Sequence, residues 1–342
     1  MYVIDVYRGD EAEKSISRYG LYQAFFPQLL AGPIARYRQM KAYLTPGKVT
    51  FDGFWSGAER FIVGFCKKVL LANQLSPVAD QIFALPPSHL SSATAWLGII
   101  CYTLQIYFDF SGCTYMAIGI GKMFGFKTPE NFNYPYISKS ITEFWRRWHI
   151  TLSEWLRDYL YIPLGGNRAG QIRTWLNLLA VFALCGIWHG ANWTFLAWGL
   201  WNGLCLVFER TGVGKKLTSM KGLNHVYASL AFILGWVFFR SADLSHASRY
   251  FLALFGLNGF SHTQSFWLFI NAKVVVLITA GVVGCTPGVS RAVSWMKTRA
   301  EERVSASVLW NGTSLTIRLA IFFVALAASA VDVHKSFIYF KF

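Results

Sequence analysis

The stretch that decides the fold is Thr174 to Glu209, TWLNLLAVFALCGIWHGANWTFLAWGLWNGLCLVFE, whose only charged residue is its last. A straight helix of this length would be about 50 Å long, whereas the hydrocarbon core of a bilayer is about 30 Å thick. We therefore expect two helices of about 15 residues each, with a break near Gly186, Gly190 and Asn192 at membrane depth.

His189 lies at this break. An ionisable side chain at membrane depth costs free energy and marks a functional site by default, because apolar surroundings oppose its charged form. An uncharged imidazole could take the proton of an attacking hydroxyl, since its reference pKa of about 6.5 suits a base at neutral pH. The alternative is a buried histidine whose ring nitrogen bonds to a carbonyl oxygen. The residue type favours acyl transfer without excluding this structural role.

The composition indicates a multi-pass membrane protein. Of the 342 residues, 54% are hydrophobic and only 14% are charged, which is too apolar for an ordinary soluble protein. The net charge of +15 is spread over connecting segments, so it predicts loops that face the cytoplasm rather than a nucleic-acid partner. We expect an all-α, multi-pass transmembrane bundle with seven or eight crossing helices and two or three interfacial or re-entrant ones. It would form a single domain, 1–342, in contact with membrane lipid.

Three segments ahead of the central stretch predict helices of different kinds. Tyr19 to Ile34 is broken by prolines and predicts short re-entrant or surface helices, whereas Phe51 to Ala84 has the periodicity of one long helix. Ser91 to Phe108 predicts a crossing helix that ends at Asp109. This carboxylate is either an intramembrane acid with a function or the residue that meets the headgroup boundary.

Ser140 to Tyr159 predicts one amphipathic helix that lies in the membrane interface. It begins with a capping-box spacing and places aromatic and aliphatic residues on one side, while three arginines oppose a central position in the bilayer. His149 falls at the edge of the apolar side and is a second candidate for a functional histidine.

Several classes of chemistry lack their motifs. The sequence has no G-x-x-x-x-G-K-[ST] loop, no G-x-S-x-G elbow and no H-E-x-x-H helix, and its six cysteines show no metal-ligand spacing. We therefore expect no metal site and no bound cofactor. The other five histidines lie in or beside polar connections, where a surface imidazole needs no function.

A family resemblance emerges from longer motifs, which occur in order along the chain. They are YVIDVY (2–7), FPQLLAGP (26–33), QIYFDFSG (105–112), NFNYPY (131–136), FWRRWH (144–149), RDYLYIPLGGNR (157–168), CGIWHG (185–190), GWVFFR (235–240) and FIYF (337–340). Through these stretches the sequence resembles the membrane-bound O-acyltransferase family, and within it the alginate O-acetyltransferase branch.

The resemblance implies an enzyme of the bacterial inner membrane that passes an acetyl group from cytoplasmic acetyl-CoA toward an exported polysaccharide, most often alginate. Periplasmic acetyltransferase partner proteins would complete the transfer. His189 matches the family's catalytic histidine, and His149 would assist or position. We expect Trp188 and Asn192 to shape the pocket.

Two departures and two rival interpretations accompany the resemblance. Asn202 stands where relatives commonly have histidine, and Thr114-Tyr115 stands where Ser-Asp is usual. Relatives also carry hydrophobic helices ahead of the stretch matched by residues 2–7, so we expect this chain to lack them. The rivals are a transporter, which would show paired internal repeats, and a non-catalytic scaffold of an exopolysaccharide-modifying complex.

The basic segments predict the orientation in the membrane. Arg210 to Lys221 and Arg291 to Arg303 should face the cytoplasm, because short loops rich in Lys and Arg are retained on that side. Single cysteines placed in these segments should resist an impermeant thiol reagent in intact cells and react after lysis. Ready labelling of either segment in intact cells would contradict the orientation.

Overall fold

The computed structural model describes residues 1–342 except 30–31, 45–48, 169, 259–264, 303 and 332–342. Every regular element in the described part is helical and no strand occurs there, so the prediction of an all-α chain is confirmed. The terminal motif at 337–340 lies outside the described residues. The α-helices are α1 Tyr2–Tyr7, α2 Ile16–Gln23, α3 Phe26–Leu29, α4 Tyr37–Met40, α5 Phe51–Cys66, α6 Asn73–Ala84, α7 Ser92–Met123, α8 Ile141–Arg147, α9 Ile150–Leu156, α10 Gln171–His189, α11 Trp193–Phe208, α12 Gly212–Ser219, α13 Leu223–Arg240, α14 Leu244–Leu254, α15 Ala272–Gly284, α16 Gly288–Glu301 and α17 Val304–Val331.

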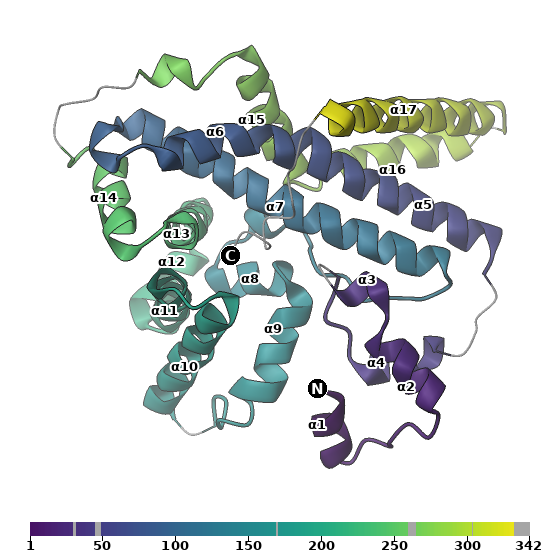
Figure 1. The fold of residues 1–342 in the computed structure, drawn as a ribbon, viewed down its shortest axis with the longest axis horizontal. Helices are drawn as coiled ribbons and strands as arrows, with labels where there is room; N and C mark the ends of the chain where they lie inside the picture. The colour runs from purple at the N-terminus through teal and green to yellow at the C-terminus, as the bar shows by residue number, and fades with distance from the viewer. Residues whose placement is uncertain (30–31, 45–48, 169, 259–264, 303, 332–342) are drawn as a thin grey trace.

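The helices form an irregular bundle around α7. Figure 1 shows α5 and α6 following one line beside α7, with α16 and α17 on one side of this layer and α8 to α11 on the other. The π-helical segment Lys67–Ala72 joins α5 to α6, so the long helix expected over Phe51 to Ala84 is present. A second π-helical segment, Arg157–Tyr161, follows α9, and 3-10 turns lie at Lys41–Tyr43, Pro87–His89, Pro135–Ile137 and Phe266–Leu268.

Fewer helices than expected have the length and apolarity of a membrane span. Within the described residues, α10, α13 and the part of α17 from Ser307 to Val331 meet both criteria, and α15 with α16 adds a fourth if this pair, bent by 67°, counts as one span. These criteria cover length and composition alone, so the estimate of seven or eight crossing helices stays a prediction. Part of the apolar sequence lies in α11, which is shorter, and part lies in α7, whose length includes buried polar residues.

The segment Ser91 to Phe108 does not end at Asp109 as expected. It belongs to α7, which continues for another fourteen residues to Met123, and Asp109 lies in the buried middle of that helix. Asp109 is therefore surrounded by protein, and its depth in the bilayer stays a prediction. The helix continues because apolar packing extends along its whole length, from Ala95 to Ile118.

Glycines let α5 and α7 pack with their backbones in contact. A Cβ atom on Gly64 would lie 2.6 Å from the carbonyl oxygen of Gly112, and one on Gly112 would lie 2.7 Å from that of Gly64. Gly57 and Gly119 repeat this reciprocal contact two turns away along the antiparallel pair. Small residues permit this approach between apolar helices, where dispersion contacts supply much of the attraction.

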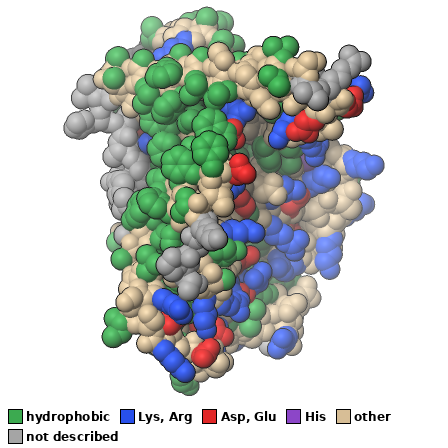
Figure 2. Space-filling model, turned by 90° about the vertical axis from the view of Figure 1, so that its right-hand side faces the viewer, with side chains coloured by type: hydrophobic (Ala, Val, Ile, Leu, Met, Phe, Trp, Pro, Cys, Tyr) green, Lys and Arg blue, Asp and Glu red, His purple; other side chains and the backbone are tan. Residues whose placement is uncertain are grey.

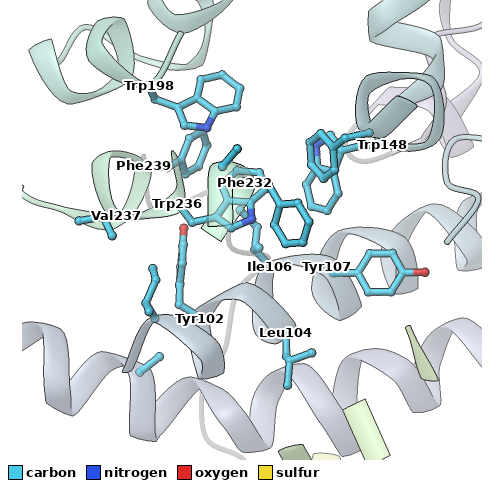
Figure 3. Packing of buried hydrophobic residues seen from close by; sticks show 14 of the residues in the cluster. Tyr102, Leu104, Ile106, Tyr107, Trp148, Trp198, Phe232, Trp236, Val237 and Phe239 are labelled. Atoms are coloured by element: carbon cyan, nitrogen blue, oxygen red, sulfur yellow. The ribbon is translucent and has the colours of Figure 1, made fainter. Parts of the chain in front are cut away.

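A buried aromatic cluster fills the space between α7, α8, α11 and α13. Figure 3 shows how these rings face one another from different helices. The members labelled there include Tyr107, Trp148, Trp198, Phe232, Trp236 and Phe239. Pairs of aromatic rings add about 0.5–1.5 kcal/mol each beyond the area that they bury. The cluster therefore fixes the relative positions of the helices that carry the candidate site.

The glycine contact generates a stability prediction. Gly64→Ala should lower the thermal unfolding midpoint in detergent, because the new methyl group meets backbone atoms that cannot rotate away, and such overpacking costs about 1–3 kcal/mol.

Gly20→Ala is the matched control. Nothing lies within 4 Å of a Cβ at Gly20 in α2, so this change should leave the midpoint unchanged or raise it. Equal midpoints for the two variants would contradict the close packing.

Candidate functional site

His189 is the last residue of α10 and lies at the tip of a helical hairpin. The chain breaks at 190–192 between α10 and α11, so the predicted break in Thr174 to Glu209 is confirmed. The depth of this tip in a bilayer stays a prediction. The two helices lie so close that a Cβ atom on Gly186 would be 2.3 Å from the carbonyl oxygen of Phe195. One on Gly199 would be 2.1 Å from that of Phe182. Backbone contact therefore fixes the tip.

Three aromatic rings surround the half-buried imidazole of His189. Its centroid is 4.9 Å from that of Trp188, 5.0 Å from that of Trp198 and 5.2 Å from that of Phe239, all in edge-to-face arrangements. Trp198 comes from α11 and Phe239 from the end of α13. The hairpin and α13 together position this ring.

Asn192 has a structural role at the hairpin tip. Its side-chain oxygen accepts a hydrogen bond from the Thr194 backbone amide at 3.1 Å and caps α11, which satisfies an amide that the helix leaves unpaired. Its amide nitrogen donates to the carbonyl oxygen of Ala242 at 2.9 Å. Asn192 thus links the hairpin to the connection between α13 and α14, and we expect it to support the pocket indirectly.

His149 lies at a break in what the sequence predicts to be one helix. Ser140 to Tyr159 forms α8 and α9, and His149 between them has a left-handed backbone with φ of +43°. The expectation of one continuous helix is therefore wrong. The apolar side of the segment Ser140 to Tyr159 is also buried inside the protein, because Phe144, Trp148 and Leu152 are each at most 3% exposed. The amphipathic pattern serves internal packing.

Asn131 fixes the tautomer of His149. Its side-chain oxygen accepts from the backbone amide and the hydroxyl of Thr151, at 3.2 and 2.9 Å, and lies 3.1 Å from Nδ1 of His149. A backbone amide can only donate, so this Asn131 atom is the acceptor and Nδ1 of His149 carries the proton. The lone pair of the neutral ring is therefore on Nε2.

Burial keeps His149 uncharged at neutral pH. The side chain is 4% exposed and its ring packs edge-to-face against Phe110 at 4.8 Å. Loss of hydration lowers the pKa of His149 to about 3, and the charge of nearby His189 adds to the lowering. The two histidines therefore belong to one region of the molecule.

A chain of three tryptophans connects the two histidines. Trp148, next to His149, is 5.0 Å from Trp236, and Trp236 is stacked at 6.0 Å on Trp198, which contacts His189. Figure 3 shows Trp236 between the other two indole rings.

Asn202 couples α8 to the hairpin. Its oxygen accepts a hydrogen bond from the indole N–H of Trp145 at 3.1 Å, and its amide donates to the carbonyl oxygen of Trp198 at 2.9 Å. Asn202 is buried, and its hydrogen-bond partner Trp198 is the residue whose ring contacts His189. The resemblance singled out this position as a departure, and the structure assigns it a local hydrogen-bonding role.

Asp109 forms a buried ion pair with Lys68 of the π-helical segment. The carboxylate lies on α7 next to Phe110, the residue whose ring contacts His149. An intramembrane acid with a cationic partner can be structural or functional. Asp109 therefore links α7 to the segment that joins α5 and α6.

The sequence alone did not identify Glu209 and Asn131 as site residues. Glu209 is buried at the end of α11, and its carboxylate accepts hydrogen bonds from the backbone amides of Ile141 and Thr142 at the start of α8. It therefore caps α8 and ties it to the hairpin. In the sequence Glu209 is simply the first charge after an apolar run, and no local pattern indicates a partner 67 residues away.

An apolar cavity of about 400 Å³ lies between α9 and α10. Trp188 and Cys185 line one wall, and Leu152, Trp155 and Leu160 line the other. Trp188 lines this cavity, but neither histidine does, so a role for Trp188 in the pocket of His189 stays a prediction. Among the described residues, no group of three or more His, Cys, Asp or Glu side chains could hold a metal ion.

Comparison with known proteins adds a family. The model of the membrane-bound O-acyltransferase family matches residues 7–240, which include both histidines and the hairpin. The chain belongs to the membrane-bound O-acyltransferase family. Membership agrees with the resemblance drawn from the motifs.

Two bacterial relatives carry alginate in their names. The probable alginate O-acetylase AlgI of Azotobacter vinelandii is 50% identical over 256 residues, which cover 74% of this chain and 51% of the relative. The protein of the same name from Pseudomonas putida is 40% identical over 352 residues, which cover 100% of this chain and 72% of the relative.

A third relative has a different acceptor in its name. The peptidoglycan O-acetyltransferase of Helicobacter pylori is 42% identical over 250 residues, which cover 71% of this chain and 47% of the relative. The chain thus spans about half the length of several curated family members that it matches.

The hydrogen bonds of Asn131 generate a prediction for this family member. Asn131→Ala should lower the unfolding midpoint in detergent, because Nδ1–H of His149 and the amide of Thr151 lose their acceptor, and each buried donor left unsatisfied costs about 1–3 kcal/mol. Asn133→Ala removes an exposed amide two residues away and should change the midpoint little. If both variants melt with the parent, Asn131 does not hold His149.

Proposed function

We propose that the protein is a membrane O-acyltransferase that passes an acetyl group from cytoplasmic acetyl-CoA across the inner membrane for O-acetylation of an exported polysaccharide, with alginate as the favoured polymer. The observation that carries this proposal is the position of His189 at the fixed tip of a hairpin, on the helix whose last turns line an apolar cavity, in a chain of this family.

His189 would act as the general base. It takes the proton of an acceptor hydroxyl while that oxygen bonds to the carbonyl carbon of the acetyl thioester. The carbon–sulfur bond then breaks, and the leaving thiolate takes the proton from the imidazole. His149 would position the surrounding residues, since it is held by Asn131 and buried behind the tryptophan chain.

The cavity suits the acyl end of the donor. Its lining is almost wholly apolar, so it can accept a short acyl group while keeping water from a reactive thioester. Both Cys185 and Trp188 lie near the end of α10. Cys185 is one turn before His189, and Trp188 immediately precedes it. The cavity is therefore lined by the same helix that carries the proposed base.

The charge distribution supports an orientation for the hairpin. Arg173 near the start of α10 and Arg210 just after α11 lie at the open end, together with the basic helix α12. The rule for basic loops places this end in the cytoplasm. A helix of 19 residues is about 28 Å long, so His189 would then lie toward the opposite face. Donor and acceptor would approach the hairpin from different sides.

The relatives support an extracytoplasmic acceptor. Alginate and peptidoglycan, named in those relatives, are polymers with sugar hydroxyls, which can serve as the final acceptors of the acetyl group. We therefore place the protein in the bacterial inner membrane, with membrane lipid around it and periplasmic acetyltransferase partner proteins completing the transfer. Two relatives named for alginate favour that polymer.

The proposed role predicts that His189→Ala abolishes acetyl transfer while abundance in the membrane stays near normal. Loss of a positioned base typically lowers a rate by about 10²–10⁴-fold, whereas the change removes little packing. The measurement is the acetyl content of the exported polymer in cells that lack their own membrane acetylase, at matched protein abundance.

His189→Asn and His225→Asn sharpen the test. Asparagine keeps a hydrogen-bonding group but cannot carry a proton at neutral pH, so His189→Asn should also be inactive. His225 is exposed on α13, so its replacement should leave acetylation unchanged. Parental activity of His189→Asn would show a structural role for His189, and the base would have to be His149.

A further inference from the structure

A second pocket lies far along α7 from the aromatic cluster, where the start of α5 meets the end of α7. Its volume is about 380 Å³, and its lining includes Thr50, Arg60, Lys122, Lys127, Thr128 and Glu130. The face of the molecule that shows these helix ends carries a group of Lys and Arg side chains below a hydrophobic region (Figure 2). The pocket is distinct from the apolar cavity at Trp188, because the two have no lining residue in common.

The lining has excess positive charge. Arg60, Lys122 and Lys127 carry three positive charges, and Glu130 carries the single negative one, which leaves a formal charge of +2. Glu130 forms a two-pronged ion pair with Arg60. Lys122 donates to the uncharged hydroxyl of Ser56, which does not neutralise it. Among the described residues, neither lysine forms an ion pair with a carboxylate.

Hydroxyl groups and a helix start add donors to this charge. Thr50 caps α5, a helix of 16 residues whose positive dipole end therefore lies at the pocket. Thr128 is 8% exposed, and its buried hydroxyl has no hydrogen-bond partner among the described residues. An unpaired buried hydroxyl costs free energy, which a rotation of this side chain toward a ligand oxygen in the pocket would relieve.

We propose that this pocket binds the phosphate group of a phosphate-bearing ligand. A phosphate offers several strong acceptor oxygens and one or two negative charges, which match two ammonium groups, a helix start and threonine hydroxyls. The pocket is larger than one phosphate, and Ile118 and Phe126 supply apolar surface for the group attached to it. Both a phospholipid headgroup and a soluble phosphate compound present this chemistry. The proposal does not require acetyl transfer.

The test compares two double variants of the purified full chain in nanodiscs. Lys122→Gln with Lys127→Gln removes the uncompensated charge, whereas Lys215→Gln with Lys216→Gln removes two exposed lysines of α12 outside the pocket. One arm titrates inorganic phosphate by calorimetry. The other measures retention of phosphatidylglycerol against phosphatidylcholine by native mass spectrometry.

The expected result is that the pocket variant binds at least about tenfold more weakly than the parent, while the α12 variant binds like the parent. Saturable binding of inorganic phosphate indicates a soluble ligand, and selective retention of phosphatidylglycerol indicates a lipid headgroup. If the parent binds neither probe, or both double variants bind alike, the proposal is overturned.

Glu130→Gln should change the affinity for the phosphate probe in the opposite direction. It removes the carboxylate that competes for Arg60, so binding of the same probe should become about tenfold stronger. A variant that only loses its fold cannot gain affinity, so this arm separates ligand binding from damage to the structure. Weaker binding by a folded Glu130→Gln variant would count against the proposal.

Discussion

Backbone contact between α10 and α11 is the constraint on which the candidate site depends. Gly186 and Gly199 bring the two helices so close that any side chain at either position would overlap a carbonyl group. The hairpin therefore has one register, and the register determines which α11 side chain faces the end of α10. Trp198 is that side chain, and it lies against His189. The position of the proposed base thus follows from the absence of two side chains several residues away.

The aromatic cluster transmits this position to the rest of the bundle. Its rings come from four helices, and the indole of Trp145 donates a hydrogen bond to Asn202. A satisfied buried polar group favours one arrangement of a core, because alternatives would leave it without a partner. Glu209 adds a second link between α8 and α11 by capping the start of α8. Hydrogen bonds and ring contacts therefore tie α8 to the hairpin that carries His189.

The sequence predicted the break in Thr174 to Glu209 because two physical signals agreed there: an uncharged run too long for one span, and glycine with asparagine in its middle. It failed for Ser140 to Tyr159 because a helix with an apolar side looks the same whether that side meets lipid or protein. The left-handed backbone at His149 was not predictable either. Histidine is enriched among the non-glycine residues in that conformation, but only a few per cent of non-glycine residues adopt it. Partners distant in sequence, such as Lys68 for Asp109, were also beyond a pattern-based interpretation.

The walls of the apolar cavity are held by interactions of different kinds, and this difference determines which wall can move. Trp188 and Cys185 belong to the hairpin, whose glycine contacts exclude both water and lipid. The opposite side includes Ile34, whose backbone amide donates to the hydroxyl of Thr151 at 3.0 Å.

Residues around Ile34 have a small hydrophobic cluster of their own, formed by Tyr22, Phe25, Ala35, Tyr37, Met40 and Leu44. The link from Arg36 to Asp158 is likewise polar. A neutral hydrogen bond contributes about 0.5–1.5 kcal/mol net and one to a charged group about 1.5–3 kcal/mol, and water can replace either of them, whereas it cannot replace a backbone contact between two helices. The wall that includes Ile34 is thus held largely by polar contacts, and the wall of the hairpin is held by backbone packing.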